Sequence, residues 1–98
     1  DNVAPRISSI FPKTRSTTRN QSPILAVQIR DSGMDVDDEK VTFYVDGIPQ
    51  SAEYDPDRNV ATSKVNRVLR RGSHSFYAVA YDYAGNKTQS RKVTFRVK

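Results

Sequence analysis

Side chains that could do chemistry are few in this 98-residue sequence, and their types exclude several kinds of site. There is no cysteine, which excludes a disulfide scaffold, a cysteine-bound zinc and thiol catalysis. The single histidine, His74, follows a turn, and general acid–base catalysis needs two positioned titratable groups in a pocket. The four glycines are isolated, so no glycine-rich phosphate loop exists. We expect a protein that is not an enzyme, with His74 packed at the foot of a strand.

The densest chemical group is the acidic segment 31–39, which holds five carboxylates. Carboxylate oxygens are the ligands that Ca²⁺ prefers. The segment is not an EF-hand, because Lys40 stands where that loop needs glycine, counting from Asp35. The alternative is a solvated turn whose carboxylates accept hydrogen bonds from backbone amides. The candidate Ca²⁺ ligands are Asp31, Asp35, Asp37 and Asp82.

Aromatic and basic side chains form a second candidate site on the outer face of one predicted sheet. Large amphipathic rings beside cations are typical of recognition surfaces, and such rings also stack on sugars or unpaired bases. Alternatively, cross-strand aromatic pairs stabilise the sheet by ~0.2–1 kcal/mol each, or a neighbouring domain covers the face. The candidate ligand-binding residues are Tyr44, Tyr77, Tyr81 and Arg96.

The charges predict which partners suit the chain. The sequence carries 16 basic and 11 acidic side chains, a formal net charge of +5. A nucleic-acid-binding module usually gathers its cations on one face away from acids, so nucleic acid is disfavoured as a partner. Counting strands places segment 31–39 at the end where the chain enters, and basic segments 13–19 and 67–71 where it leaves. Tandem modules would then meet through opposite charges; the alternative is an ordinary solvated mixture.

The elements that position these residues are predicted to be strands. Apolar and polar residues alternate in four segments, which is the pattern of half-buried antiparallel strands. The four are residues 24–30, 40–46, 75–82 and 92–98, and weaker strands are expected at 6–11, 51–54 and 60–65. Residues 12–23 are expected to form a polar connection. Seven short strands in this length predict an all-β, seven-stranded antiparallel sandwich.

The phase of the strand at 75–82 is open from the pattern alone. Either Phe76, Ala78 and Ala80 or the alternate set with Tyr77, Val79 and Tyr81 faces inward.

Length and hydropathy predict one domain that stays out of the membrane. A chain of 98 residues forms one module, with a linker at 1–5 and the sandwich at 6–97. No apolar run approaches the ~18 residues of a membrane span. The absence of an initiator methionine and of a signal peptide indicates a fragment of a longer chain.

Several motifs together resemble the bacterial Ig-like domains, a fibronectin-III-like sandwich group. They are Leu69, Gly72 and His74 before a strand, the run Asp-Tyr-Ala-Gly-Asn at 82–86, and the opening Ala-Pro-Arg-Ile at 4–7. The acidic run Asp-Ser-Gly-Met-Asp at 31–35 and the strand 41–47 ending in Asp-Gly are also similar. The resemblance implies that Phe76, Ala78 and Ala80 face the core. Tyr77, Val79, Tyr81 and Tyr83 would then point outward.

The resemblance also implies a function and a place. It suggests a non-catalytic spacing or adhesion module of a secreted or surface-anchored bacterial protein, outside the cell or in its envelope. The alternative is a cell-wall glycan-binding module, or an accessory domain of a wall-processing enzyme, that uses the tyrosine-rich face. The expected partners are neighbouring domains of the same chain, a cell-wall glycan or another surface protein. The isolated domain is expected to be a monomer.

Overall fold

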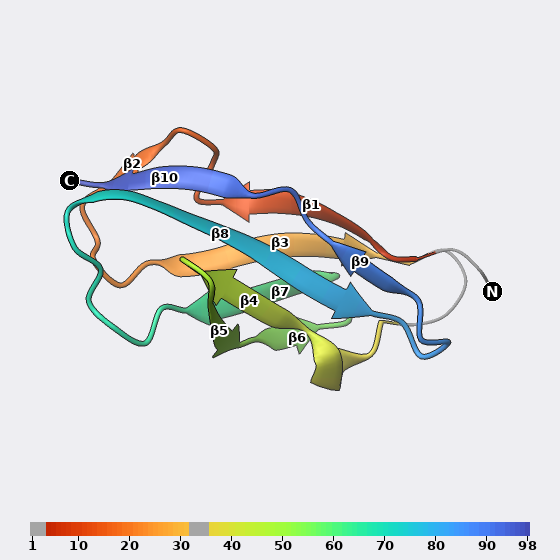
Figure 1. Cartoon of the computed structure of the whole chain (residues 1–98). Coiled ribbons are helices and arrows are strands. Elements are labelled where there is room, and N and C mark those ends of the chain that lie inside the picture. The colour runs from red at the N-terminus through yellow and green to blue at the C-terminus, as the bar shows by residue number, and fades with distance from the viewer. Residues whose placement is uncertain (1–3, 32–35) are drawn as a thin grey trace.

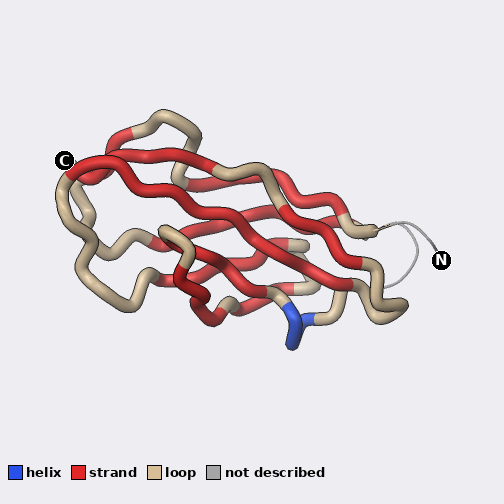
Figure 2. The backbone as a smooth tube through the Cα atoms, in the orientation of Figure 1, coloured by secondary structure: helices blue, strands red, loops and turns tan. Residues whose placement is uncertain are grey.

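The computed structural model describes residues 4–31 and 36–98, which are almost entirely strands and turns (Figure 2). The strands are β1 (Arg6–Phe11), β2 (Thr17–Thr18), β3 (Ile24–Arg30), β4 (Thr42–Val45), β5 (Ile48–Ser51), β6 (Glu53–Asp55), β7 (Val60–Lys64), β8 (Gly72–Tyr81), β9 (Lys87–Gln89) and β10 (Val93–Val97). One short 3-10 turn, η1 (Asp38–Lys40), precedes β4.

Two sheets stack face to face, as the alternating pattern predicts (Figure 1). The first sheet has the strand order β1-β3-β7-β6. The second has the order β2-β10-β8-β4-β5, and β9 pairs with the far part of β8. All pairs are antiparallel except β2 with β10, which run parallel. The molecule is elongated, with extents of 43 × 23 × 21 Å.

The core lies between the sheets and is built from every second residue of the long strands. The three rings of Phe43, Phe76 and Phe95 are fully buried, with centroids 6.1 Å apart for the first two and 6.3 Å for the last two. Each such side chain contributes roughly 1.5–3 kcal/mol by its burial. Ala78 and Ala80 are buried beside them, so the inward phase implied by the Ig-like resemblance is confirmed.

Val79 points outward with Tyr77, as expected, yet only 8% of it is exposed. Its neighbours across the sheet are Gln89 of β9 and Thr42 of β4. Directly opposed side chains lie within contact distance on one face of a sheet, so these two flank the valine. The outward direction of Val79 agrees with the Ig-like resemblance, and its burial was not foreseen because β9 was not predicted.

The predicted strand at 51–54 is in fact two short strands in different sheets. β5 ends at Ser51 and belongs to the second sheet, whereas β6 begins at Glu53 and belongs to the first. The chain therefore crosses the edge of the sandwich at Ala52. The connection 12–23 likewise contains β2, and β9 follows β8, so the described residues hold ten strands rather than seven.

A two-residue turn joins β4 to β5 and fixes their register. Asp46 and Gly47 have φ angles of 51° and 82°, and the flanking pair is Val45 with Ile48. Positive φ at both central residues matches the twist of a hairpin, and Asp-Gly favours that conformation. The turn aims the Asp46 side chain toward β8.

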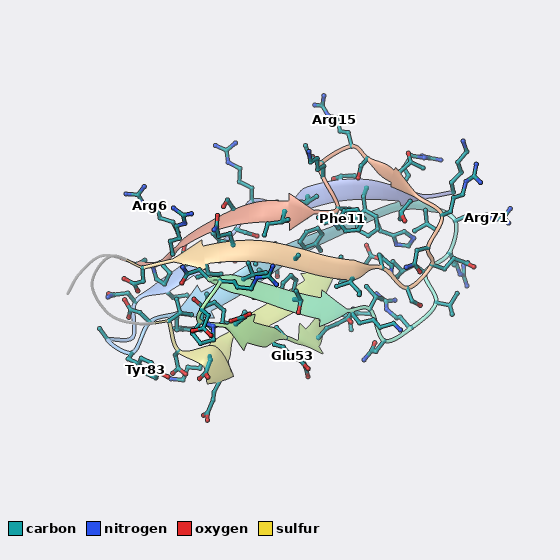
Figure 3. All side chains as sticks on the ribbon, turned by 180° about the vertical axis from the view of Figure 1, so that it is seen from behind. Arg6, Phe11, Arg15, Glu53, Arg71 and Tyr83 are labelled. Atoms are coloured by element: carbon teal, nitrogen blue, oxygen red, sulfur yellow. The ribbon has the colours of Figure 1, made fainter. Side chains whose placement is uncertain are left out.

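The two ends of the sandwich collect different loops. We call the end that holds residues 36–40, 54–59 and 82–86 the entry end, because β1 starts there. The other, which holds residues 65–71 and the chain terminus, we call the exit end. Figure 3 shows Arg6 and Tyr83 at the entry end and Arg71 at the exit end. This agrees with the strand count made from the sequence.

Candidate functional site

The tyrosine pair on the second sheet is the centre of the predicted ligand-binding face. Tyr44 and Tyr77 are direct cross-strand partners in β4 and β8. Their rings stack with centroids 4.9 Å apart and planes 15° from parallel. Both side chains are half-buried, and Pro49 of the edge strand β5 is the next neighbour of Tyr44. The pair forms a flat aromatic surface held by two strands.

The other two predicted ligand-binding residues lie away from that pair. Tyr81 is four residues further along β8, or about 13 Å at the rise of a strand. The Nζ atom of Lys40 lies 5.8 Å from its ring centroid, a cation–π contact. Arg96 pairs with Ser73, four residues from Tyr77 in the opposite direction. The four residues share one face, but only Tyr44 and Tyr77 touch.

Asp82, a candidate calcium ligand, is 2% exposed and closes the turn 82–86. Its Oδ1 accepts a hydrogen bond from the backbone amide of Asn86, and its Oδ2 accepts one from the Asn86 Nδ2, both at 2.9 Å. Burial by itself would raise the pKa of Asp82, but these hydrogen bonds outweigh it and hold the pKa below its ordinary range. The Asp-Tyr-Ala-Gly-Asn motif is therefore a structural turn.

The remaining candidate ligands for Ca²⁺ are engaged locally or lie outside the described residues. Asp37 accepts a hydrogen bond from the amide of Glu39 at 3.2 Å, and its other oxygen is 3.9 Å from Lys40 Nζ. Asp35 lies outside the described residues. Within residues 4–31 and 36–98, no three metal-binding side chains gather at one point. The local contacts of Asp37 and Asp82 favour the alternative prediction, a turn whose carboxylates accept hydrogen bonds from nearby amides.

His74 is bound on both sides of its ring by hydrogen-bond acceptors. Its Nδ1 lies 2.6 Å from the Asp46 carboxylate and its Nε2 lies 2.6 Å from the carbonyl oxygen of Arg70. Neither partner can donate, so both contacts are hydrogen bonds only when both ring nitrogens carry protons, and the geometry favours the imidazolium form. Burial lowers its pKa, but the two hydrogen bonds and the charge of Asp46 together raise it above the ordinary 6.5.

This charged role of His74 escaped the sequence reasoning, which predicted only packing. The ring does pack near Phe95, with centroids 6.0 Å apart. The signal that could have revealed the ion pair is the Asp46-Gly47 turn. Asp46 follows the end of β4 and therefore lies beside the first residues of β8, the strand that pairs with β4. Asp46 Oδ1 also accepts from the Ser75 amide at 3.0 Å, and Arg67 lies 3.8 Å from Oδ2.

No family model and no curated protein sequence matches the chain. In the part of the chain that is described, no helix is long and apolar enough to cross a membrane.

Solved structures are similar over nearly the whole chain. The dimeric latent PorU of Porphyromonas gingivalis matches with a TM-score of 0.77 and 18% identity, over 100% of this chain and 11% of that one. The endo-beta-1,4-mannanase of Thermotoga petrophila matches with a TM-score of 0.75 and 12% identity, over 100% of this chain and 20% of that one. This chain therefore spans only a small part of either protein.

One smaller structure matches along nearly all of its own length. The fibronectin(III)-like modules of CbhA from Clostridium thermocellum give a TM-score of 0.70 at 20% identity, over 95% of this chain and 96% of that one. At these identities the likeness concerns the fold alone. The chain has the fibronectin-III-like β-sandwich fold that the Ig-like resemblance implied.

Proposed function

We propose that the chain is a non-catalytic Ig-like spacing and adhesion module of a secreted or surface-anchored bacterial protein. The observation that carries this proposal is the match of the whole chain to a minor part of two larger chains, 11% of one and 20% of the other. The body is elongated, with a longest extent of 43 Å, and β1 begins at one end whereas β10 ends at the other (Figure 1). This shape suits a spacer between domains.

Adhesion would use the Tyr44–Tyr77 surface. Two stacked rings present a rigid area that loses little conformational entropy on binding and accepts a sugar face or an apolar side chain. A cell-wall glycan is the second candidate ligand, and the endo-beta-1,4-mannanase among the structural neighbours favours a carbohydrate context. In that case the module would serve as an accessory domain of a wall-processing enzyme.

The test is co-sedimentation of the purified domain with bacterial cell-wall sacculi at low and high salt. The informative variant is the double substitution Tyr44→Ser/Tyr77→Ser, which removes both rings from the face. Tyr83→Ser is the matched control, because that tyrosine is 58% exposed at the entry end and lies off the face.

Salt-resistant binding that falls at least tenfold in the double variant and persists in the control supports adhesion through the tyrosine pair. Binding that disappears with salt in all three proteins contradicts it, since it reflects only the attraction of a basic domain to an anionic surface. Absence of binding also contradicts adhesion to the wall and leaves spacing as the role.

A further inference from the structure

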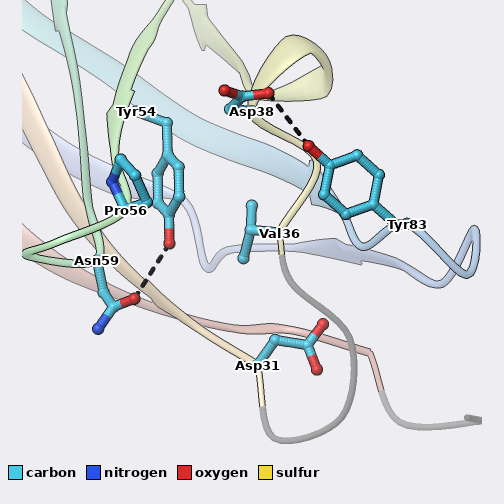
Figure 4. Close-up of a pocket in the computed structure, with 7 residues that line it drawn as sticks. All are labelled: Asp31, Val36, Asp38, Tyr54, Pro56, Asn59 and Tyr83. Atoms are coloured by element: carbon cyan, nitrogen blue, oxygen red, sulfur yellow. Dashed lines mark hydrogen bonds between the residues drawn. The ribbon is translucent and has the colours of Figure 1, made fainter.

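A cavity of about 260 Å³ opens at the entry end, between the turn 54–59 and the segment that leads into β4. It is lined by Asp31, Val36, Asp38, Tyr54, Pro56, Asn59 and Tyr83 (Figure 4). Figure 4 shows Tyr54 and Tyr83 on opposite sides of the Val36 side chain, with Asp38 above it and Asp31 below. Two aromatic rings and two carboxyl groups thus surround one apolar floor.

The walls of this cavity are held in place by the fold. Val36 forms an isolated bridge with Asp82, which ties its segment to the end of β8. The hydroxyl of Tyr54 lies 3.2 Å from Asn59 Oδ1, and the Asn59 carbonyl accepts from the Ile29 amide at 2.8 Å. The cavity therefore draws on both sheets and is a product of the tertiary structure.

Among the described residues that line the cavity, Asp31 and Asp38 are acidic and none is basic. The Tyr83 hydroxyl donates to Asp38 at 3.4 Å. The charge of Asp38, with burial and the charges of Asp37 and Glu39, raises the pKa of Tyr83 above its ordinary 10. The basic neighbour Lys40 points elsewhere, toward Asp37 and the Tyr81 ring.

We propose that this cavity binds the guanidinium group of an arginine side chain. A guanidinium is planar, stacks on tyrosine faces and presents donors in a fork that fits a carboxylate. Tyr54 and Tyr83 line the cavity with aromatic rings, and Asp38 supplies the exposed carboxylate. A metal ion suits the site less well, because no three metal-binding groups converge among the described residues.

The arginine has two possible sources with the same chemistry. One is a separate polypeptide. The other is the exit end of a second copy of this chain, where Arg70 and Arg71 are exposed. Binding of that second kind would join copies head to tail.

The experiment is a titration of the ¹⁵N-labelled domain with N-acetyl-arginine methylamide, followed by amide chemical shifts. The uncharged isostere N-acetyl-citrulline methylamide is the ligand control. We expect saturable shifts confined to the cavity residues, with a Kd on the order of 1–10 mM for a single side chain. Asp38→Asn and Tyr83→Leu should each weaken binding at least fivefold. Both positions are exposed, so both variants should fold.

Glu53→Gln is the matched variant, since it removes one carboxylate charge from β6 outside the cavity lining. Its affinity should equal that of the unaltered domain. The proposal is overturned if the shifts do not saturate, if citrulline causes the same shifts, or if Asp38→Asn binds arginine unchanged.

A dilution series of the domain alone distinguishes the sources. Shifts of the cavity amides that grow with protein concentration and vanish in Arg70→Gln/Arg71→Gln identify a second copy. Concentration-independent spectra, together with binding of the arginine probe, identify a separate polypeptide.

Discussion

The Nδ1 atom of His74 lies 2.6 Å from the Oδ2 atom of Asp46, across the gap between β8 and the turn that follows β4. The second ring nitrogen lies near a carbonyl oxygen, so these contacts favour the charged form of the histidine. Asp46 in turn joins three groups at the exit end, namely His74, Arg67 and the Ser75 amide.

This ion pair predicts a stability that falls as the pH rises above neutral. The pKa of His74 is raised in the folded state, whereas a histidine in an unfolded chain titrates near 6.5. The folded state therefore binds the proton more tightly. The stabilisation is complete below about pH 6.5 and is lost as the pH rises through the raised pKa. Urea unfolding at a series of pH values from about 5.5 to 9 measures it.

Asp46→Asn is the variant that isolates this effect. It should lower the free energy of unfolding near pH 6 by about 1.5–3 kcal/mol, the usual range for a hydrogen bond to a charged group, and flatten the pH dependence. A variant that keeps the full pH dependence would show that His74 is not its source.

The turn closed by Asp82 predicts a second stability change, at acid pH. Asp82→Ala removes a buried acceptor of two Asn86 donors and should cost about 2–3 kcal/mol at pH 7. Because its folded-state pKa is lowered, the stabilisation is present above the unfolded value near 3.9 and is lost as the pH falls through the depressed pKa. Asp57→Asn, in an exposed turn, is the control and should change stability by under about 0.5 kcal/mol. Equal effects of the two substitutions would contradict the assignment.

Calcium is predicted to leave the melting temperature unchanged. Both oxygens of Asp82 are occupied by donors of Asn86, and Asp37 is engaged with Glu39 and Lys40. Calorimetry with about 5 mM Ca²⁺ or with EDTA checks this, because a ligand that binds the folded state raises the melting temperature. A melting temperature that is several degrees higher in Ca²⁺ than in EDTA would contradict this prediction and support a metal site in the acidic segment.

The tyrosine pair is predicted to contribute to folding as well as to any binding. Tyr44→Ser and Tyr77→Ser should each destabilise the domain by about 1 kcal/mol, and a double-mutant cycle should give a coupling of about 0.5–1 kcal/mol. Zero coupling would mean that the stacked geometry has no energetic weight in the free domain.

A chain of two copies is predicted to be extended at low salt and to lose its fixed orientation at high salt. The entry end carries Asp38 and Glu39 beside its cavity, and the exit end carries Arg70 and Arg71. Opposite charges that meet at a junction attract less as the Debye length shrinks from about 10 Å at 0.1 M to 3 Å at 1 M salt. Small-angle X-ray scattering should give a maximum dimension near twice 43 Å at low salt and a broader distribution at high salt. Profiles that do not respond to salt would contradict charge-guided orientation.

The sequence was most informative where alternation is long. The strands around Val27, Phe43 and Phe95 follow from their period of two, because a one-residue slip would move every apolar side chain into water. The phase of β8 could not be read this way, since alanines and tyrosines on its two faces are equally compatible with burial. The Ig-like resemblance, rather than the pattern, predicted the correct phase.

Elements that depend on tertiary contacts could not be predicted from the sequence. β2 and β9 are two and three residues long, and neither Thr17 nor Thr88 stands in an alternating pattern. The change of sheet at Ala52 depends on pairing partners that lie elsewhere in the chain, because β5 pairs with β4 and β6 pairs with β7. The same limit applied to the predicted ligand-binding face. Tyr81 and Arg96 share that face with Tyr77, but Tyr81 lies four residues further along β8 and Arg96 lies opposite Ser73, four residues before Tyr77.

The parallel pairing of β2 with β10 gives the module a mechanical property. The Arg96 amide donates to Ser16 and the Lys98 amide donates to Thr18, while the Arg15 amide donates to Thr94. A pull between the two ends draws β10 toward the exit end and, once β1 has separated from β3, draws β2 the opposite way along their common axis. The force then acts along the strands, so the hydrogen bonds between them are loaded in shear and must break together rather than one by one. A module that joins two bodies under tension would resist extension at this small ladder after the pairing of β1 with β3 has opened.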